Sequence, residues 1–331
     1  MDCRPGLAAC FRSVVRSLRF CFTALLVLLV ACERPGTEQC LREAMSDTGL
    51  ESGILQVDTG GVVRRVASTA GAEERFKQSV MAASLTKPIV AAEVRRQVDA
   101  GRLVLDTPIS DLLPDVALGS GKAGVTLRRL LQHTAGFDHE LSGDPLFEGR
   151  AAQRCPVAAK RVLARPLDFP PGSRIAYSNA GYCLLGEVVL RTDTSLTPQL
   201  RNALSSHLGA AGGWRTPLPI LFQALKQTLP LQALPAEARL PDGSYYSYGW
   251  RHWPDGSGEP PWTHFGRLPG MLSVAMSDGR SRLLVAHFLG DPVDYNETAE
   301  QFSRNAWRCL PDWHGGVPQL PEHKPTGTPA R

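Results

Sequence analysis

The pattern of apolar and polar positions divides the chain into segments with different predicted structures. After an apolar run at residues 20–31, short runs at 53–57 and 62–68 predict two strands. The sequence Asp58-Thr59-Gly60-Gly61 between them predicts the turn of a hairpin. Helical spacing and the Pro and Gly breaks around it then predict helices at residues 88–100, 125–132, 144–165 and 181–191.

The pattern changes again beyond about residue 242. Short aromatic and β-branched runs separated by Gly, Pro and Asp predict antiparallel strands at residues 245–253, 262–265, 272–277 and 282–289. A last helix is predicted at 299–309, and the Pro/Gly/His-rich residues 311–331 predict a disordered tail. Strands at both ends of the chain can combine into one sheet, with the helical stretch as an insertion between them. No internal repeat is evident.

The apolar run at residues 20–31 predicts an export signal. It carries no charge, follows four arginines, and is too short to span a bilayer as a helix. It ends in Leu29-Val30-Ala31-Cys32, which resembles the bacterial lipoprotein cleavage box. We therefore expect a signal peptide over 1–31, a lipid on Cys32, a tether over 32–37, and a membrane-anchored protein that faces the periplasm. A plain cleaved signal and a short uncleaved anchor are the alternatives.

The charge balance argues against a nucleic-acid partner. The whole chain has a formal net charge of +4, but residues 1–31 hold four of its 36 basic residues and one of its 32 acidic residues. The remaining 300 residues therefore have a net charge of +1, with no clustered basic stretch of the kind that binds nucleic acid. That length suits one large domain or two closely packed lobes.

The cysteines point to disulfides rather than to a metal site. Three cysteines lie within the predicted signal and Cys32 is expected to carry lipid, which leaves Cys40, Cys155, Cys183 and Cys309. An even number in an exported protein fits disulfide bonds, and the sequence alone allows three pairings. No Cys-x-x-Cys or closely spaced Cys/His pair is present, so we expect no metal and no cofactor.

Candidate chemistry begins at Ser84-Leu85-Thr86-Lys87, at the start of the predicted helix 88–100. A serine and a lysine three positions apart lie on one face of a helix, where they can share a proton. Such a neighbour addresses the weakness of serine as a nucleophile, whose hydroxyl needs a base or a positive charge nearby. On these residues alone, an N-capping serine followed by a solvated lysine is the simpler interpretation.

Two further clusters can complete a site. Tyr177 can act as a base only where nearby cations lower the pKa of its phenol, and Lys87 is the candidate cation. Asn179 can hydrogen-bond a substrate amide. In the predicted strands, Gly266 follows His264 by two positions and allows close approach of another backbone, so a backbone N–H just past it can join that of Ser84 around an oxyanion.

Taken in order, these motifs resemble the serine β-lactamase and penicillin-binding-protein superfamily. Ser84-x-x-Lys87, Tyr177-x-Asn179 and His264-x-Gly266 resemble the variant found in class C β-lactamases, D-alanyl-D-alanine carboxypeptidases and related esterases. The stretches 130–137 and 177–186 are also similar to elements of that family. The resemblance extends from about Cys40 to Cys309.

The resemblance implies an α+β fold, with an antiparallel sheet flanked by helices and a mainly helical lobe at about 101–240, within a hydrolase domain over 38–310. It implies that Ser84 is acylated, that Lys87 and Tyr177 share the base role, and that the N–H groups of Ser84 and Arg267 form the oxyanion hole. Substrate contacts are expected from Asn179, His264, Gly266 and Arg267. For the disulfides it implies the pair Cys40–Cys309, which leaves Cys155–Cys183. His133 is assigned to structure.

One departure from the family pattern affects substrate choice. Class C β-lactamases usually have a lysine where this chain has His264, and a neutral histidine attracts a substrate carboxylate less strongly. Arg267 is a possible source of the missing charge. We therefore expect a D-alanyl-D-alanine carboxypeptidase-like or esterase-like enzyme acting on a small molecule or peptide. The alternatives are a class C-like β-lactamase and a non-catalytic lipoprotein that binds cell-wall peptides or penicillin.

Overall fold

The computed structural model describes residues 36–115, 122–147, 154–193 and 195–310. The predicted signal peptide, Cys32 and the predicted tail at 311–331 lie outside these residues. The described chain from Thr37 onward belongs to one compact unit. None of its helices combines the length and the apolar character that crossing a membrane would require.

A seven-stranded antiparallel sheet joins the two ends of the chain. Its strands lie in the order β2-β1-β9-β8-β7-β6-β5. Strand β1 pairs with β9 along its whole length, from Ser52 opposite Leu289 to Thr59 opposite Arg282. The strands are β1 (Ser52–Thr59), β2 (Val63–Ala67), β5 (Tyr245–Ser247), β6 (Trp250–His252), β7 (Trp262–Leu268), β8 (Met271–Ser277) and β9 (Arg282–Leu289). The predicted combination of the early hairpin and the late strands into one sheet is confirmed.

The predicted strand at 245–253 is two strands. Tyr248 and Gly249 both have positive φ, 45° and 80°, so the chain turns back between β5 and β6. A side chain at position 249 would meet Pro88 at 2.7 Å, which shows how closely this turn packs against the helix that follows Ser84. The apolar pattern alone did not reveal the turn, because aromatic residues continue through it.

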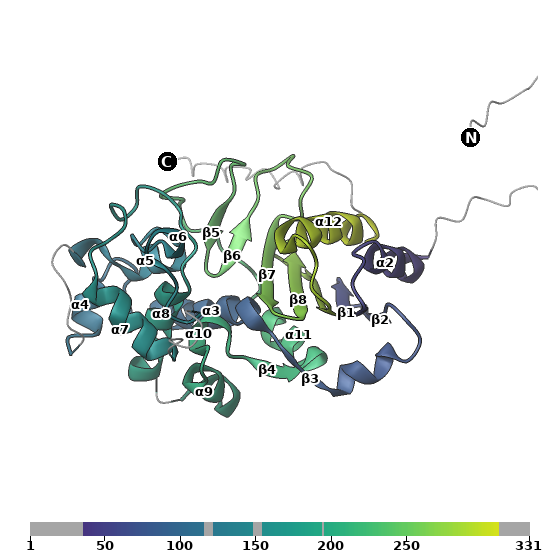
Figure 1. The fold of residues 1–331 in the computed structure, drawn as a ribbon, viewed down its shortest axis with the longest axis horizontal. Helices are drawn as coiled ribbons and strands as arrows, with labels where there is room; N and C mark the ends of the chain where they lie inside the picture. Colours follow the sequence, from purple (N-terminus) through teal and green to yellow (C-terminus); the bar gives the residue numbers. More distant parts are fainter. Residues whose placement is uncertain (1–35, 116–121, 148–153, 194, 311–331) are drawn as a thin grey trace, which may run out of the picture. The chain divides into compact units, whose positions relative to one another are not determined.

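Two helices cover one face of the sheet. Figure 1 shows α2 (Thr37–Ser46) and α12 (Tyr295–Arg308) side by side there, and Cys40 and Cys309 form a disulfide between them. Alternate residues of the strands point into this layer. Its buried side chains include Leu41, Phe302 and Trp307 from the helices and Leu284, Ala286 and Phe288 from β9.

The other face of the sheet packs on the helical part of the chain, where the larger core lies. The α-helices there are α3 (Thr86–Asp99), α4 (Ile109–Leu112), α5 (Leu127–Leu131), α6 (His139–Ser142), α7 (Cys155–Ala164), α8 (Asn179–Thr192), α9 (Pro198–Ser205), α10 (Gly209–Gly212) and α11 (Leu218–Lys226). A second disulfide, Cys155–Cys183, joins α7 to α8. The α+β architecture predicted from the sequence is confirmed.

The predicted helix at 144–165 begins later than expected. Only Cys155–Ala164 is helical, and Asp144 lies in a loop. The Asp144 carboxylate accepts a hydrogen bond from the N–H of Leu146 at 3.0 Å, which stabilises a turn that competes with helix formation. This loop brings Asp144 to the candidate active site.

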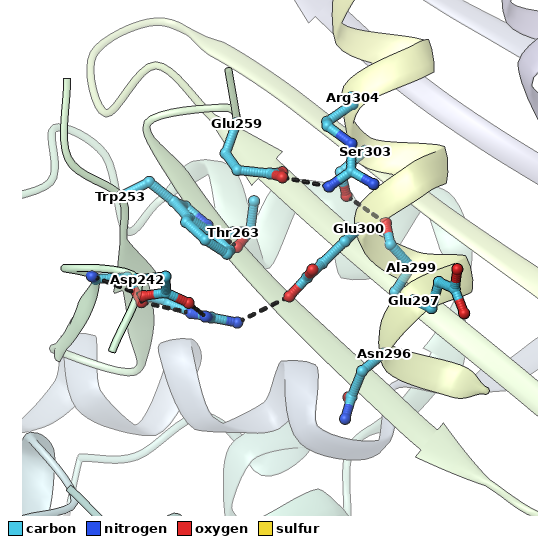
Figure 2. Close-up of polar contacts among 12 residues, drawn as sticks. Asp242, Trp253, Glu259, Thr263, Asn296, Glu297, Ala299, Glu300, Ser303 and Arg304 are labelled. Atoms are coloured by element: carbon cyan, nitrogen blue, oxygen red, sulfur yellow. Dashed lines mark hydrogen bonds and ion pairs between the residues drawn. The ribbon is translucent and has the colours of Figure 1, made fainter. Parts of the chain in front are cut away.

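Ion pairs tie α12 to the late strands and their loops. Arg304 pairs with Glu259, and Glu300 lies 3.0 Å from Arg251, which also pairs with Asp242 (Figure 2). Glu259 is only 8% exposed, so its ionised carboxylate has little solvent around it and is stabilised by the guanidinium of Arg304.

Candidate active site

Ser84 lies in a single 3₁₀ turn that leads into α3, and this turn has an uncommon backbone conformation. Ala83 has a φ of 46°, which costs about 1–3 kcal/mol for a residue with a side chain. Trp214 holds the turn from both sides, because its carbonyl accepts from the N–H of Ala82 at 2.9 Å and its N–H donates to Oγ1 of Thr86 at 3.1 Å. Ser84 is partly exposed, while the residues next to it are buried.

Lys87 is fully buried, and its side-chain nitrogen has three oxygen neighbours. Nζ lies 3.0 Å from Oγ of Ser84, 2.8 Å from Oδ1 of Asn179 and 2.6 Å from the carbonyl oxygen of Ala211. The amide and carbonyl oxygens only accept, so they take the two hydrogens of a neutral amine. Its lone pair then faces Ser84, whose hydroxyl can donate to it. This geometry suits Lys87 to remove the proton of Ser84.

The protonation of Lys87 is set by burial and by one carboxylate. Burial lowers the pKa of Lys87 to about 7, and the charge of Asp144 acts in the opposite direction. A substantial fraction of Lys87 is therefore neutral at pH 7, as a base must be.

Tyr177 differs from the sequence-based expectation. Burial raises the pKa of its phenol, Tyr246 adds to the rise, and a hydrogen bond with Ser84 only partly opposes it. Nζ of Lys87 lies 4.8 Å from the centre of the Tyr177 ring, and its three hydrogen bonds go to other groups. The expected lowering of the phenol pKa by Lys87 is wrong in direction. Tyr177 is a protonated phenol, and its hydroxyl lies 3.5 Å from Nε2 of His264.

His133 positions the loop that carries Tyr177. Its backbone carbonyl accepts from the N–H of Ala176 at 2.9 Å, and its Nδ1 accepts from the N–H of Ser178 at 3.1 Å. Its ring stacks on Tyr177 with a centroid separation of 4.4 Å. Burial lowers the pKa of His133 well below its ordinary value, so the ring is neutral. These contacts agree with the structural role assigned to His133 from the sequence.

Asn179 is the first residue of α8, whose N-terminus is capped by the side chain of Ser178. Its Oδ1 accepts from Lys87, and its Nδ2 donates to Oδ2 of Asp144 at 2.8 Å. The amide is thus fixed at both ends, with one Nδ2 hydrogen still available for a substrate. No motif in the sequence indicated Asp144, because it lies in a loop 35 positions before Asn179.

Gly266 brings strand β7 against the nucleophile turn. A Cβ at this position would lie 2.6 Å from the carbonyl oxygen of Ala82 and 3.0 Å from the backbone nitrogen of Ser84. Only glycine fits this approach, which places the backbone that leads to Arg267 beside the N–H of Ser84. The Arg267 side chain is exposed, and its guanidinium lies 5.7 Å from the centre of the Tyr295 ring.

His264 lies beside Tyr177 on the sheet side of the site. It is 3% exposed, and burial, together with the charge of Lys87, lowers its pKa well below its ordinary value. Tyr246 of β5 extends this wall, with ring centroids 6.3 Å from His264 and 4.8 Å from His133. Tyr246 was not predicted, because a strand tyrosine gives no sign of which residues it will face.

The structure thus brings together the predicted residues Ser84, Lys87, Tyr177, Asn179 and His264, with Gly266 next to Ser84. Within the described part of the chain, no group of three or more His, Cys, Asp or Glu side chains is arranged to hold a metal ion. Both disulfides pair as the family resemblance implied.

Comparison with known proteins identifies the family. The family model described as Beta-lactamase matches residues 38–218, which is more than half of the chain. The chain belongs to the beta-lactamase family. The match includes Ser84, Lys87, Tyr177 and Asn179, whereas His264 and Gly266 lie beyond its end.

Two curated relatives are similar in sequence to part of this beta-lactamase family protein. Penicillin-binding protein 4 of Amycolatopsis lactamdurans is 33% identical over 161 residues, which are 47% of this chain and 40% of that protein. Esterase EstB of Burkholderia gladioli is 38% identical over 128 residues, 33% of this chain and 31% of that protein. The chain thus spans well under half of the length of either relative.

A solved structure supports the fold. The beta-lactamase/D-alanine carboxypeptidase from Yersinia pestis, crystallised with citrate, superposes with a TM-score of 0.66 and 17% sequence identity. The match covers 83% of this chain and 98% of that one. At this identity the comparison concerns the fold alone.

Proposed function

We propose that this beta-lactamase family protein hydrolyses an amide or ester through an acyl-enzyme on Ser84, with Lys87 as the base. The observation that carries the proposal is the set of three oxygens around Nζ of Lys87. Two of them, from Asn179 and Ala211, accept hydrogens, so the lone pair of the neutral amine faces the Ser84 hydroxyl.

Each catalytic step has a group that suits it. Lys87 takes the Ser84 proton as Oγ bonds to the substrate carbonyl carbon, and the N–H groups of Ser84 and Arg267 stabilise the oxyanion. The carbon then loses its amine or alcohol, which needs a proton. The Tyr177 phenol keeps its proton, so its hydroxyl can give that proton to the leaving group, and the ammonium of Lys87, which holds the proton taken from Ser84, can replace it. Water then attacks the carbonyl carbon of the Ser84 ester and gives a proton to neutral Lys87. The bond from that carbon to Oγ breaks, Oγ takes the proton back from Lys87, and the acid product leaves.

The surroundings of His264 favour a peptidase or an esterase over a β-lactamase. A buried neutral histidine offers no positive charge to the carboxylate of a β-lactam, and the nearest cation on the same strand, Arg267, is exposed three positions away. We therefore favour a D-alanyl-D-alanine carboxypeptidase-like or esterase-like activity. The names of the relatives, a penicillin-binding protein and an esterase, are consistent with this range of substrates.

The test is to incubate the protein with a chromogenic short-chain ester, a D-alanyl-D-alanine peptide and a fluorescent penicillin, and to measure its intact mass. We expect ester or peptide turnover and a covalent adduct that Ser84→Ala abolishes and the remote Ser110→Ala retains. Rapid penicillin turnover would instead indicate a β-lactamase. No adduct and no turnover with any substrate would indicate a binding protein.

We also propose that a lipid on Cys32 holds the protein at the cell envelope. The support is the sequence Leu29-Val30-Ala31-Cys32 after an apolar run. Cells fed a labelled fatty acid should incorporate it into the wild type and not into Cys32→Ser, and the variant should leave the membrane fraction. Equal labelling of both would contradict the proposal.

A further inference from the structure

The orientation of the Asn179 amide depends on Asp144. A carboxamide has one accepting end and one donating end, and only its partners decide which way it points. The ionised carboxylate of Asp144 can only accept, so it pairs with Nδ2 of Asn179 at 2.8 Å. Oδ1 must then point to Lys87, whose Nζ lies 2.8 Å away. A turn holds the carboxylate itself, through the N–H of Leu146.

The negative charge of Asp144 also raises the pKa of Lys87. The other titratable side chains that face the amine are held neutral by burial, which lowers the pKa of the histidines and raises the pKa of the tyrosines: His133, Tyr177, Tyr182 and His264. A negative charge one side chain away stabilises the ammonium form of a buried lysine.

We propose that Asp144 is a positioning residue of this site, which fixes the Asn179 amide toward Lys87 and whose negative charge controls the protonation of Lys87. This inference rests on the proposed role of Lys87 as the base. It assigns a function to a loop residue that does not itself touch Ser84, and it explains why both ends of the Asn179 side chain are engaged.

The decisive variant is Asp144→Asn, which preserves the shape and can still offer an oxygen to Asn179, but removes the charge. Lys87 should then lose its proton at a lower pH, by roughly one pH unit. Asp144→Ala also removes the partner of Nδ2, which lets the Asn179 amide move, and should reduce kcat/KM by about tenfold or more. Glu140→Gln removes an exposed carboxylate four positions before Asp144 and should change neither property.

The protonation of Lys87 can be followed without relying on turnover. The chain has six lysines, so a protein labelled with ¹³C at lysine Cε gives few NMR signals, and Lys87→Arg identifies the one of interest. A lower titration midpoint in Asp144→Asn, with an unchanged midpoint in Glu140→Gln, would support the inference. An unchanged midpoint in Asp144→Asn would overturn it.

Measuring turnover together with the NMR titration distinguishes a failure of this inference from a failure of the proposed hydrolase function. If wild-type protein hydrolyses the ester, the acid limb of its kcat/KM profile should move to lower pH together with the NMR midpoint in Asp144→Asn. If wild-type protein forms no Ser84 adduct, the proposed hydrolase function fails, while the NMR titration still decides whether Asp144 controls Lys87. Circular dichroism checks that each variant is folded.

Discussion

At the scale of single residues, the site depends on a lysine that has no contact with water. Lys87 is 0% exposed, so its charge is stabilised only by neighbouring oxygens and by Asp144. Burial has the opposite consequence for Tyr177, where the neutral form is the protonated one. The same loss of solvation therefore prepares Lys87 to accept a proton and keeps a proton on Tyr177.

The pH dependence of hydrolysis should report Lys87. Its pKa of about 7 means that the amine becomes neutral, and able to accept the Ser84 proton, as the pH rises through 7. We expect kcat/KM for an ester to increase about tenfold per pH unit below that value and to level off above it. Stopped-flow or plate assays between pH 5 and 9 measure this profile. A flat profile over the whole range would exclude Lys87 as the base.

Gly266→Ala should impair catalysis more than folding. The added Cβ would lie 3.0 Å from the backbone nitrogen of Ser84 and must displace the turn or the strand. We expect kcat to fall by about 10²–10³-fold, the usual effect of losing an oxyanion donor. Gly181→Ala is the control, because its Cβ would meet other atoms at 3.4 Å or more. Equal activity of the two variants would contradict this role of Gly266.

At the scale of elements, α12 is attached to the sheet by apolar packing on one side and by ion pairs on the other. Phe302 and Trp307 lie in the core, whereas Glu300 pairs with Arg251 of β6 and Arg304 pairs with Glu259 in the loop before β7. The pairs in Figure 2 thus hold β6 and the loop before β7, the strand that carries His264, against α12.

Arg304→Met should destabilise the fold without altering the site. It leaves the carboxylate of Glu259, 8% exposed, without its guanidinium partner. We expect the free energy of unfolding to fall by about 1–3 kcal/mol in urea titrations. Adding Glu259→Gln removes the buried charge and should recover part of the loss. A double variant less stable than Arg304→Met would contradict this account.

Sequence patterns located most elements but not their ends. The hairpin, α3, α8, β8 and β9 follow from strand and helix spacing, because each buries one face or a continuous apolar run. The start of α7 was placed too early, and the turn between β5 and β6 was missed. In both places a local turn interrupts an apolar pattern that by itself would allow a longer element.

At the scale of the whole molecule, the Cys40–Cys309 disulfide connects the first and last described helices across 269 positions. A crosslink that closes so long a loop restricts the unfolded chain strongly, and we expect Cys40→Ser with Cys309→Ser to cost about 2–4 kcal/mol of stability. The pair Cys155–Cys183 closes only 28 positions and should contribute less. Chemical denaturation of the two double variants compares them. An equal loss would argue against the loop-entropy explanation.

The sequence by itself determined which residues the family resemblance assigns to the site, because each motif is local. Ser84 and Lys87 share one helical turn, Tyr177 and Asn179 share one loop, and His264 and Gly266 share one strand. It also determined the order of strands and helices, which follows from apolar periodicity.

Only the tertiary structure decided how these residues behave. The carbonyl of Ala211, the carboxylate of Asp144 and the ring of Tyr246 come from distant segments whose local sequence gives no sign of their partners. Protonation depends on burial and on nearby charge, both of which arise from packing. For that reason the sequence located Tyr177 at the site, but only the folded chain showed the protonation of both groups. The phenol of Tyr177 keeps its proton, whereas the amine of Lys87 becomes neutral near pH 7 and can act as a base.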